Sequence, residues 1–217
     1  MNQKSQLKIH PKMITGIKGI IQGGISIQDF SAVTKMNEID SKIILDEFIK
    51  NEIGTINDGV YYFEDGDKLK IAVALLEKGF PIDEIAIELD WRDFEGLTAE
   101  VLSEKNFAVL KNVMLKKPRM EIDVVGIRLG IAILIDCKHW NRYSTSALSA
   151  AVQKQIERTK QYVAKTPGAI AVPVIVTLYQ DKINFIENVP IVPIFQFGSF
   201  VDEFYGNIDQ MKTIGTD

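Results

Sequence analysis

Residues 121–140 contain the side chains whose types and spacing could do chemistry. Asp136 and Lys138 are two positions apart, so on a β-strand they would share one face, with the residue between them on the other face. A hairpin that turns between positions 129 and 130 would place Asp123 directly opposite Asp136. Directly opposed like charges destabilise a sheet unless something neutralises them. The sequence therefore predicts an acidic pair that needs a partner.

Two remedies are open for this acidic pair, and a purely structural reading of the hairpin is the alternative. A hard divalent cation with oxygen ligands would neutralise both carboxylates and would favour magnesium-dependent phosphate chemistry. One carboxylate could instead stay protonated. The same register sets Glu121 opposite Lys138, which allows a purely structural ion pair worth on the order of a few tenths of a kcal/mol. We expect the cation, because the two aspartates and the lysine lie in otherwise apolar strands.

The segments around this hairpin predict an α/β domain. From Trp91 onward, periodicity and turn signals indicate a helix, three strands, a long helix and further strands. The expected strands cover residues 107–115, 120–127, 131–140, 169–179, 182–187 and 189–196, and the expected helices cover residues 92–106, 147–164 and 199–207. This order is typical of a mixed sheet covered by helices.

Residues 13–89 are predicted to be mostly helical with one short strand pair. Helices are expected over residues 13–22, 27–36, 42–53, 68–79 and 81–89, with N-caps at Ser26 for the second, at Asp40 or Ser41 for the third and at Asp67 for the fourth. A turn signal at residues 57–59 precedes a strand at residues 60–63. Three helices followed by a β-ribbon resemble the layout of a winged helix, which binds duplex DNA or serves in dimerisation or docking. We therefore expect a helical, winged-helix-like domain at residues 1–90 and a second domain at residues 91–217.

Charge is unevenly distributed along this chain of 217 residues, whose formal net charge is −4. Residues 1–36 carry +4, residues 37–104 carry −12, residues 105–165 carry +8 and residues 166–217 carry −4. The acidic total argues against a wholly basic nucleic-acid coat protein. The block of +8, however, contains the whole hairpin, so the local charge favours a phosphate substrate.

The cellular compartment is predicted from three features. The single cysteine, Cys137, excludes an intrachain disulfide and favours a reducing environment. The polar first residues lack the apolar core of a signal peptide. The longest uncharged run, residues 166–180, is too short to span a bilayer. We expect a cytoplasmic protein with no membrane partner.

The order of a helix glutamate, a strand aspartate and a D/E-x-K element resembles the PD-(D/E)xK nuclease superfamily, which has the restriction-endonuclease-like fold. The likeness is greatest to archaeal Holliday junction resolvases and Mrr-type restriction enzymes. The matching positions are Phe94-Glu95, Asn106-Phe107, Asp123 and Asp136-Cys137-Lys138. Ile122 stands where the superfamily has proline, and Asn106 stands where these families commonly have glycine. The resemblance covers roughly residues 91–200.

The resemblance implies metal-dependent hydrolysis of DNA phosphodiester bonds. Asp123, Asp136 and the backbone carbonyl of Cys137 would hold Mg²⁺ or Mn²⁺. Lys138 would position or help to deprotonate the attacking water and would stabilise charge that develops on the phosphate. The thiol of Cys137 would face the core as a small apolar group.

A helix carboxylate would complete this site. The resemblance assigns that role to Glu95, with Glu100 as the rival on the same helix. It also implies a homodimer and a branched, damaged or foreign DNA substrate. A nuclease that acts on RNA, and a non-catalytic DNA-binding or scaffold protein that retains the nuclease fold, are the alternatives.

Basic residues near the hairpin are predicted to bind the DNA backbone. Lys116, Lys117 and Arg119 come directly before the strand that carries the first aspartate. The long helix that follows the second aspartate is predicted to bury a stripe of side chains, namely Leu148, Val152, Ile156, Thr159 and Val163. Lys154 and Arg158 lie on its polar face. Any one of these residues could be an ordinary solvated cation, but the cluster favours a phosphate-rich partner.

Overall fold

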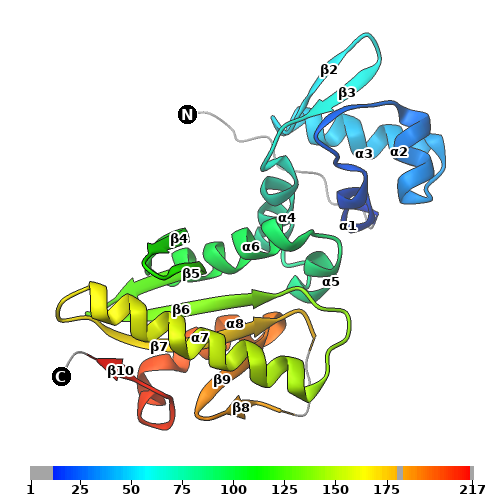
Figure 1. Cartoon of the computed structure of the whole chain (residues 1–217). Helices are drawn as coiled ribbons and strands as arrows, with labels where there is room; N and C mark the ends of the chain where they lie inside the picture. Colours follow the sequence, from blue (N-terminus) through cyan, green and yellow to red (C-terminus); the bar gives the residue numbers. More distant parts are fainter. Residues whose placement is uncertain (1–11, 180–182, 216–217) are drawn as a thin grey trace. The chain divides into compact units, whose positions relative to one another are not determined.

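The structure, a computed structural model, describes residues 12–179 and 183–215. It divides into two units, Met1–Asp93 and Phe94–Asp217, whose elements are labelled in Figure 1. The sequence placed the division near residue 90. Each unit has its own sheet and its own buried apolar side chains.

The N-terminal unit combines short helices with a small sheet. Its helices are α1 (Met13–Gly16), which continues into the 3-10 turn η1 (Ile17–Gly19), α2 (Ile27–Thr34), α3 (Glu38–Lys50), α4 (Asp67–Glu77) and α5 (Ile82–Ile87). Its strands β1 (Gly23–Ile25), β2 (Thr55–Asn57) and β3 (Val60–Phe63) form an antiparallel sheet in the order β1-β3-β2. The turn between β2 and β3 is confirmed, since Asp58 and Gly59 both have the positive φ of a tight hairpin turn. The winged-helix assignment of this unit stays a prediction.

The helix starts in this unit depend on side-chain caps, and one cap differs from expectation. Ser26 caps α2 as predicted, because its hydroxyl accepts a hydrogen bond from the Asp29 N–H at 3.1 Å. Helix α3 begins earlier than predicted. Its N-cap is Asn37, whose side-chain oxygen accepts the Asp40 N–H at 2.8 Å, rather than Asp40 or Ser41.

Two further elements of the N-terminal unit differ from the sequence prediction. The helix expected over residues 13–22 ends as a 3-10 turn at Gly19, because Ile20 has extended backbone angles. Asp67 is the first residue of α4 rather than its N-cap. Its carboxylate accepts the Glu64 N–H at 2.8 Å and so closes the loop before the helix.

Helix α6 (Trp91–Glu104) enters the C-terminal unit at Phe94. The strands of this unit are β4 (Ala108–Lys116), β5 (Arg119–Arg128), β6 (Ile131–Lys138), β7 (Ile170–Thr177), β8 (Phe185–Ile186), β9 (Val189–Pro193) and β10 (Ile214–Gly215). Its other helices are α7 (Thr145–Lys165) and α8 (Ile194–Glu203). Two 3-10 turns follow α8, η2 (Phe204–Gly206) and η3 (Ile208–Gln210). The predicted order of helix, three strands, helix and strand is confirmed. No helix in the part of the chain that the structure describes is long and apolar enough to cross a membrane.

The last predicted elements of this unit need correction. The strand expected over residues 182–187 is reduced to β8, and its first residue lies outside the described residues. The strand expected over residues 189–196 ends at Pro193, where α8 begins. The terminal helix therefore starts earlier than the predicted residue 199.

The described strands of the C-terminal unit form a seven-stranded mixed sheet. The order is β4-β5-β6-β7-β9-β8, with β10 paired to β7. Strands β4, β5 and β6 are antiparallel neighbours, whereas β6, β7 and β9 run parallel. Helix α7 makes the crossover between the parallel strands β6 and β7. The unit is therefore an α/β fold with a large mixed sheet flanked by helices.

Neighbouring residues on β6 identify the helix that covers each face of the sheet. Asp136 accepts a hydrogen bond from Arg158 of α7, whereas the sulfur of Cys137 lies 3.6 Å from the hydroxyl of Thr98 on α6. Since successive side chains of a strand point to opposite faces, α7 and α6 cover opposite faces. Figure 1 shows α7 crossing the near face of the sheet, with α8 behind it.

The apolar stripe predicted for the long helix is confirmed. Leu148, Val152, Ile156, Thr159 and Val163 are all buried along α7. Seven of the eight residues of the central strand β7 are buried as well, as expected for a strand with helices on both faces. This packing holds α7 against the strands that carry the acidic pair.

Gly126 of β5 allows α6 to approach the sheet closely. A Cβ atom at this position would lie 2.8 Å from Cδ1 of Leu102 and 3.3 Å from Cδ1 of Phe107. Both of those side chains are buried. Glu95 is two helical turns before Leu102 and shares its side of α6. The close approach therefore also sets the position of Glu95 relative to the hairpin.

We expect Gly126→Ala to lower the free energy of unfolding by about 1–3 kcal/mol, because it overpacks this contact. Gly198→Ala is the matched control, because Gly198 lies in α8 with open space around its Cβ position. That substitution should raise the free energy of unfolding by about 0.5–1 kcal/mol through helix propensity. Chemical denaturation measures both values, and equal effects would contradict the close approach of α6.

Candidate active site

The β5–β6 hairpin has the register that the sequence predicted. Its pairs extend outward to Val124 and Ile135, so the next position holds Asp123 and Asp136. There the backbone N–H of Cys137 donates a hydrogen bond to Oδ2 of Asp123 at 2.8 Å. The side chain of Asp123 on β5 is thus hydrogen-bonded to the backbone of β6, the strand that carries Asp136.

Asp136 is buried, with 1% of its surface exposed, and both of its oxygens face cations. Oδ1 accepts a hydrogen bond from Nη1 of Arg158 at 2.5 Å, and Oδ2 lies 2.5 Å from Nζ of Lys138. Lys138 pairs with the aspartate of its own strand, so the cross-strand pair with Glu121 that the register allowed does not form. The ammonium of Lys138 also lies 5.5 Å from the ring centre of Trp140.

Glu95 reaches this acidic hairpin from α6. Burial, and then the charge of Asp123, raise the pKa of Glu95 to about 7, with smaller contributions from two other carboxylates and partial opposition from Lys138. Glu100, the rival on the same helix, is not among the groups that shift the pKa of Glu95 or Asp123. Glu95 therefore lies close enough to the hairpin to be affected by its charges, as the resemblance implied.

Asp123 also carries a perturbed carboxyl group. Burial, and then the charge of Asp136, raise the pKa of Asp123 to about 6, although the Cys137 N–H and two nearby cations act in the opposite direction. Near neutral pH, Asp123 and Glu95 are thus close to holding a proton. Protonation and an added cation, the two remedies that the sequence left open, would relieve the same excess of negative charge.

The donor set fits a hard divalent cation. The carboxylates of Glu95, Glu121, Asp123 and Asp136 outnumber the cations of Lys138 and Arg158. Carboxylate and carbonyl oxygens suit Mg²⁺ and Mn²⁺ rather than a softer metal. Across residues 12–179 and 183–215, no three histidine, cysteine or acidic side chains converge on one point as metal ligands would. Oδ1 of Asp136 is hydrogen-bonded to Arg158, whereas Oδ2 is buried beside Lys138 without a hydrogen bond.

The thiol of Cys137 plays no part in this cluster. Burial, and then the charge of Asp123, raise the pKa of the Cys137 thiol well above its ordinary value. The thiol therefore stays protonated at neutral pH and packs beside Thr98 on the α6 side of the sheet. Only the backbone of Cys137 is available to the acidic face.

Gln155 is a residue of the site that the sequence prediction missed. It is fully buried on α7, and its side-chain nitrogen donates to the backbone oxygen of Leu134 at 2.7 Å. Its side-chain oxygen lies 3.4 Å from Nη1 of Arg158. The sequence did contain a signal for this role, because Gln155 is a polar residue that falls between Val152 and Thr159 in the apolar stripe of the helix.

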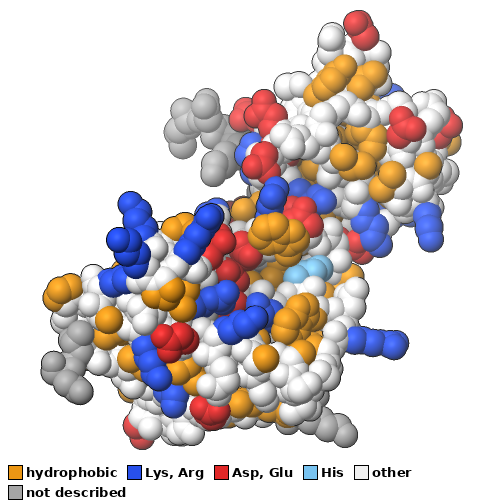
Figure 2. Space-filling model, in the orientation of Figure 1, with side chains coloured by type: hydrophobic (Ala, Val, Ile, Leu, Met, Phe, Trp, Pro, Cys, Tyr) orange, Lys and Arg blue, Asp and Glu red, His pale blue; other side chains and the backbone are white. Residues whose placement is uncertain are grey.

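Three of the five basic residues predicted to bind DNA line one groove. Arg119, Lys154 and Arg158, together with Met120, Glu121 and Glu157, surround a cavity of about 310 Å³. Arg158 differs from the prediction, because its guanidinium is engaged by Asp136 instead of facing the solvent as a separate phosphate contact. Figure 2 shows acidic side chains gathered on this face of the unit, with lysines and arginines beside them.

Lys116 and Lys117 do not line this groove, although Lys116 pairs across the β4–β5 hairpin with Arg119, which does. Both are exposed, at the end of β4 and in the turn that follows it. The backbone oxygen of Lys117 accepts a hydrogen bond from Nζ of Lys165 at 2.6 Å. Their side chains are the two predicted phosphate contacts that lie outside the lining of the groove.

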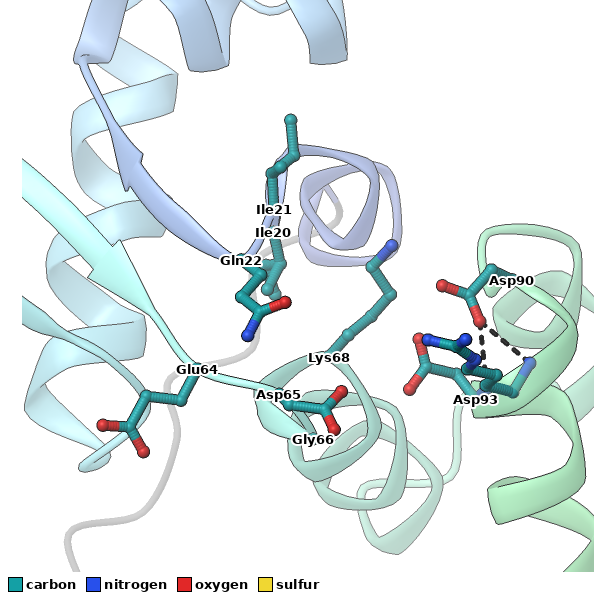
Figure 3. Close-up of a pocket in the computed structure, with 10 residues that line it drawn as sticks. Ile20, Ile21, Gln22, Glu64, Asp65, Gly66, Lys68, Asp90 and Asp93 are labelled. Carbon is teal, nitrogen blue, oxygen red and sulfur yellow. Dashed lines mark hydrogen bonds between the residues drawn. The ribbon is translucent and has the colours of Figure 1, made fainter.

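A second cavity, of about 230 Å³, lies in the N-terminal unit and is drawn in Figure 3. The carboxylates of Glu64, Asp65, Asp90 and Asp93 and the cations of Lys68 and Arg92 line it. One oxygen of Asp90 accepts the N–H groups of Arg92 and Asp93, as the dashed lines show. Burial, and then the charge of Asp90, raise the pKa of Asp93. No residue of the acidic hairpin takes part in this cavity.

The fold and the site define an α/β protein with an oxygen-rich acidic cluster on the face of a mixed sheet. No family model matches the chain. An uncharacterized protein of Archaeoglobus fulgidus is 31% identical over 119 residues, which span 53% of this chain and 92% of that protein. The chain therefore belongs to the same family as this archaeal protein.

Two solved structures resemble the chain more distantly. Protein VC1899 from Vibrio cholerae has a TM-score of 0.46 at 11% identity, covering 93% of this chain and 58% of that protein. Can2 from Sulfobacillus thermosulfidooxidans, solved in complex with cyclic tetra-adenylate, has a TM-score of 0.40 at 13% identity, covering 75% of this chain and 44% of Can2. The chain spans about half the length of these two proteins.

The raised pKa of Glu95 predicts how stability depends on pH. The folded protein binds this proton more tightly than the unfolded chain, so stability falls as the pH rises from 4.5 to about 7. We expect Glu95→Gln to remove that loss. Because water partly screens the site, the gain above pH 7 should be about 1–2 kcal/mol, and it should vanish below pH 4.5.

Denaturant titrations in EDTA across this pH range measure the effect. Glu100→Gln is the matched control, because it removes one carboxylate from the same helix. A gain for Glu95→Gln that is equal at every pH would contradict the assigned environment of this carboxylate.

Proposed function

We propose that the C-terminal unit is a divalent-metal-dependent nuclease that hydrolyses phosphodiester bonds of DNA. The observation that carries the proposal is that Glu95, Asp123, Asp136 and Lys138 affect one another's charge at one end of the β5–β6 hairpin. Phosphodiester hydrolysis needs an activated water molecule and positive charge beside the phosphate. Carboxylates that outnumber their cations, with a lysine fixed among them, are suited to provide both.

Asp123, Asp136 and the backbone carbonyl of Cys137 are the groups that would hold Mg²⁺ or Mn²⁺. Bound there, such an ion would polarise a phosphate oxygen and lower the pKa of a water molecule. Lys138 is held between Asp136 and the ring of Trp140, so its ammonium offers a fixed positive charge to a phosphate oxygen. Glu95, with a pKa of about 7, can accept a proton from water near neutral pH.

The groove beside the acidic cluster supports a polymeric phosphate substrate. Arg119 and Lys154 line it next to Arg158, and repeated cations are what a phosphate backbone binds. Branched, damaged or foreign DNA is the substrate that the resemblance to resolvases and Mrr-type enzymes favours. In this proposal the N-terminal unit is a winged-helix-like module that binds duplex DNA or docks a protein, and the nuclease acts as a homodimer.

One observation favours a second candidate, a DNA-binding or scaffold protein that retains the fold without catalysis. Both oxygens of Asp136 are engaged by Arg158 and Lys138. If those ion pairs persist when DNA binds, the carboxylate is structural and no metal site forms. The groove would still bind a phosphate backbone in that case.

Cleavage assays with supercoiled, single-stranded and four-way-junction DNA, each with Mg²⁺ or Mn²⁺, test the nuclease directly. We expect the wild-type protein to cut at least one of these substrates and to stop when EDTA removes the metal. Asp136→Asn and Lys138→Met should each lower the cleavage rate by about a hundredfold or more, as loss of a group that stabilises the transition state does.

Lys160→Met is the control for these variants, because Lys160 is exposed on α7 and does not line the groove. It should keep the wild-type rate. Equal rates in all four proteins would show a contaminating nuclease and would end the catalytic assignment. An RNA strand of the same sequence, assayed in parallel, decides between DNA and RNA.

A further inference from the structure

Asp136 cannot ligate a metal ion while both of its oxygens are held by cations. Arg158 lies 2.5 Å from Oδ1, and Lys138 lies 2.5 Å from Oδ2. The residue is 1% exposed, and Oδ2 makes no hydrogen bond besides its ion pair with Lys138. One of the two cations has to move before Asp136 can serve as a ligand.

Arg158 is the cation that has an alternative binding position, in the groove. Its side chain is 23% exposed and lines the groove together with Arg119 and Lys154. A phosphate in that groove would meet three cations and two carboxylates, those of Glu121 and Glu157. The guanidinium groups are the donors suited to it, because they bind phosphate oxygens in pairs. Lys138, in contrast, extends from the same strand as Asp136, and its ammonium lies by the Trp140 ring.

We propose that Arg158 is a phosphate-operated latch on Asp136. In the free protein, Arg158 occupies Oδ1 of Asp136 and blocks it as a metal ligand. When a backbone phosphate binds at Arg119 and Lys154, the guanidinium moves into the groove to bind that phosphate, and Oδ1 becomes free for the metal. This inference rests on the proposed function, since it concerns how that same site becomes able to bind metal. Nucleic acid and metal would then each strengthen the binding of the other.

Gln155 sets the closed position of the latch. It is fully buried and is anchored to the backbone of Leu134, and its side-chain oxygen lies 3.4 Å from Nη1 of Arg158. That separation is long for a hydrogen bond, so Gln155 orients Arg158 without holding it firmly. Gln155 is therefore a positioning residue, and Asp136 provides the main hold on Arg158.

The charges balance in both positions of the latch. When Arg158 leaves, Asp136 keeps Lys138 as a partner and gains the arriving divalent cation. The carboxylate is thus never left buried without compensation, which would be costly. The arginine exchanges a carboxylate for a phosphate, so it also keeps an anionic partner.

The coupling is tested on the wild-type protein by measuring Mn²⁺ affinity alone and with a short DNA duplex whose phosphorothioate linkages resist hydrolysis. Electron paramagnetic resonance reports free Mn²⁺, and protein-free duplex supplies the blank. We expect the duplex to tighten Mn²⁺ binding by roughly tenfold, and Mn²⁺ to tighten duplex binding by the same factor, as linkage requires. Unchanged Mn²⁺ affinity with saturating duplex would overturn the latch, whatever the variants do.

Arg158→Met removes the latch and keeps much of the side-chain volume. It should bind Mn²⁺ roughly tenfold more tightly than wild type without DNA, and the increase caused by the duplex should disappear. Lys160→Met, the same substitution at an exposed position of α7, should leave Mn²⁺ affinity and coupling as in wild type. Wild-type Mn²⁺ affinity in Arg158→Met, or coupling retained in it, would overturn the proposal.

The results separate this inference from the proposed nuclease. If wild type cuts DNA with metal and Arg158→Met binds Mn²⁺ no more tightly, the latch fails and the nuclease stands. If neither protein binds Mn²⁺ with or without duplex and neither cuts DNA, both proposals fail. The metal-binding readout does not depend on catalysis, so an inactive but coupled protein would still support the latch.

Discussion

The paired charges of Asp136 are the interaction on which the rest of the candidate site depends. Removing a carboxylate from water costs several kcal/mol unless cations replace its hydration. Here Arg158 and Lys138 each lie 2.5 Å from one of its oxygens. Because Lys138 belongs to β6 and Arg158 to α7, the pairs join the hairpin to the crossover helix. The same contacts decide whether the carboxylate is open to a metal, so the structural and the functional demands on Asp136 conflict.

The scaffold concentrates negative charge at one end of the sheet. The antiparallel register of β5 and β6 brings Asp123 to the position opposite Asp136, and the close packing of α6 over Gly126 carries Glu95 to the same place. Burial then raises the pKa of Glu95 to about 7 and that of Asp123 to about 6. Such an arrangement opposes stability, and groups of this kind are found more often at functional sites than elsewhere.

The charge of the whole chain conceals this organisation. A net charge of −4 over 217 residues disfavours a nucleic-acid partner when taken alone, yet the block of residues 105–165 is strongly basic and contains Asp123, Asp136 and Lys138. The N-terminal unit has the opposite character, and carboxylates predominate in its own cavity. The local balance of charge, and not the total, bears on what each unit binds.

The sequence by itself determined the features that follow from local periodicity. The two-residue repeat of a strand and a short hairpin turn are enough to predict that Asp123 opposes Asp136 and that Cys137 faces away. The helical periodicity of the apolar residues is likewise enough to predict the buried stripe of α7. Only the tertiary structure decided that Arg158 contacts Asp136 and that Glu95 comes close enough to the hairpin carboxylates to be affected by their charge. Those contacts depend on the rotation and height at which α6 and α7 pack against the sheet, which arise from many distant side-chain contacts and leave no mark in local spacing.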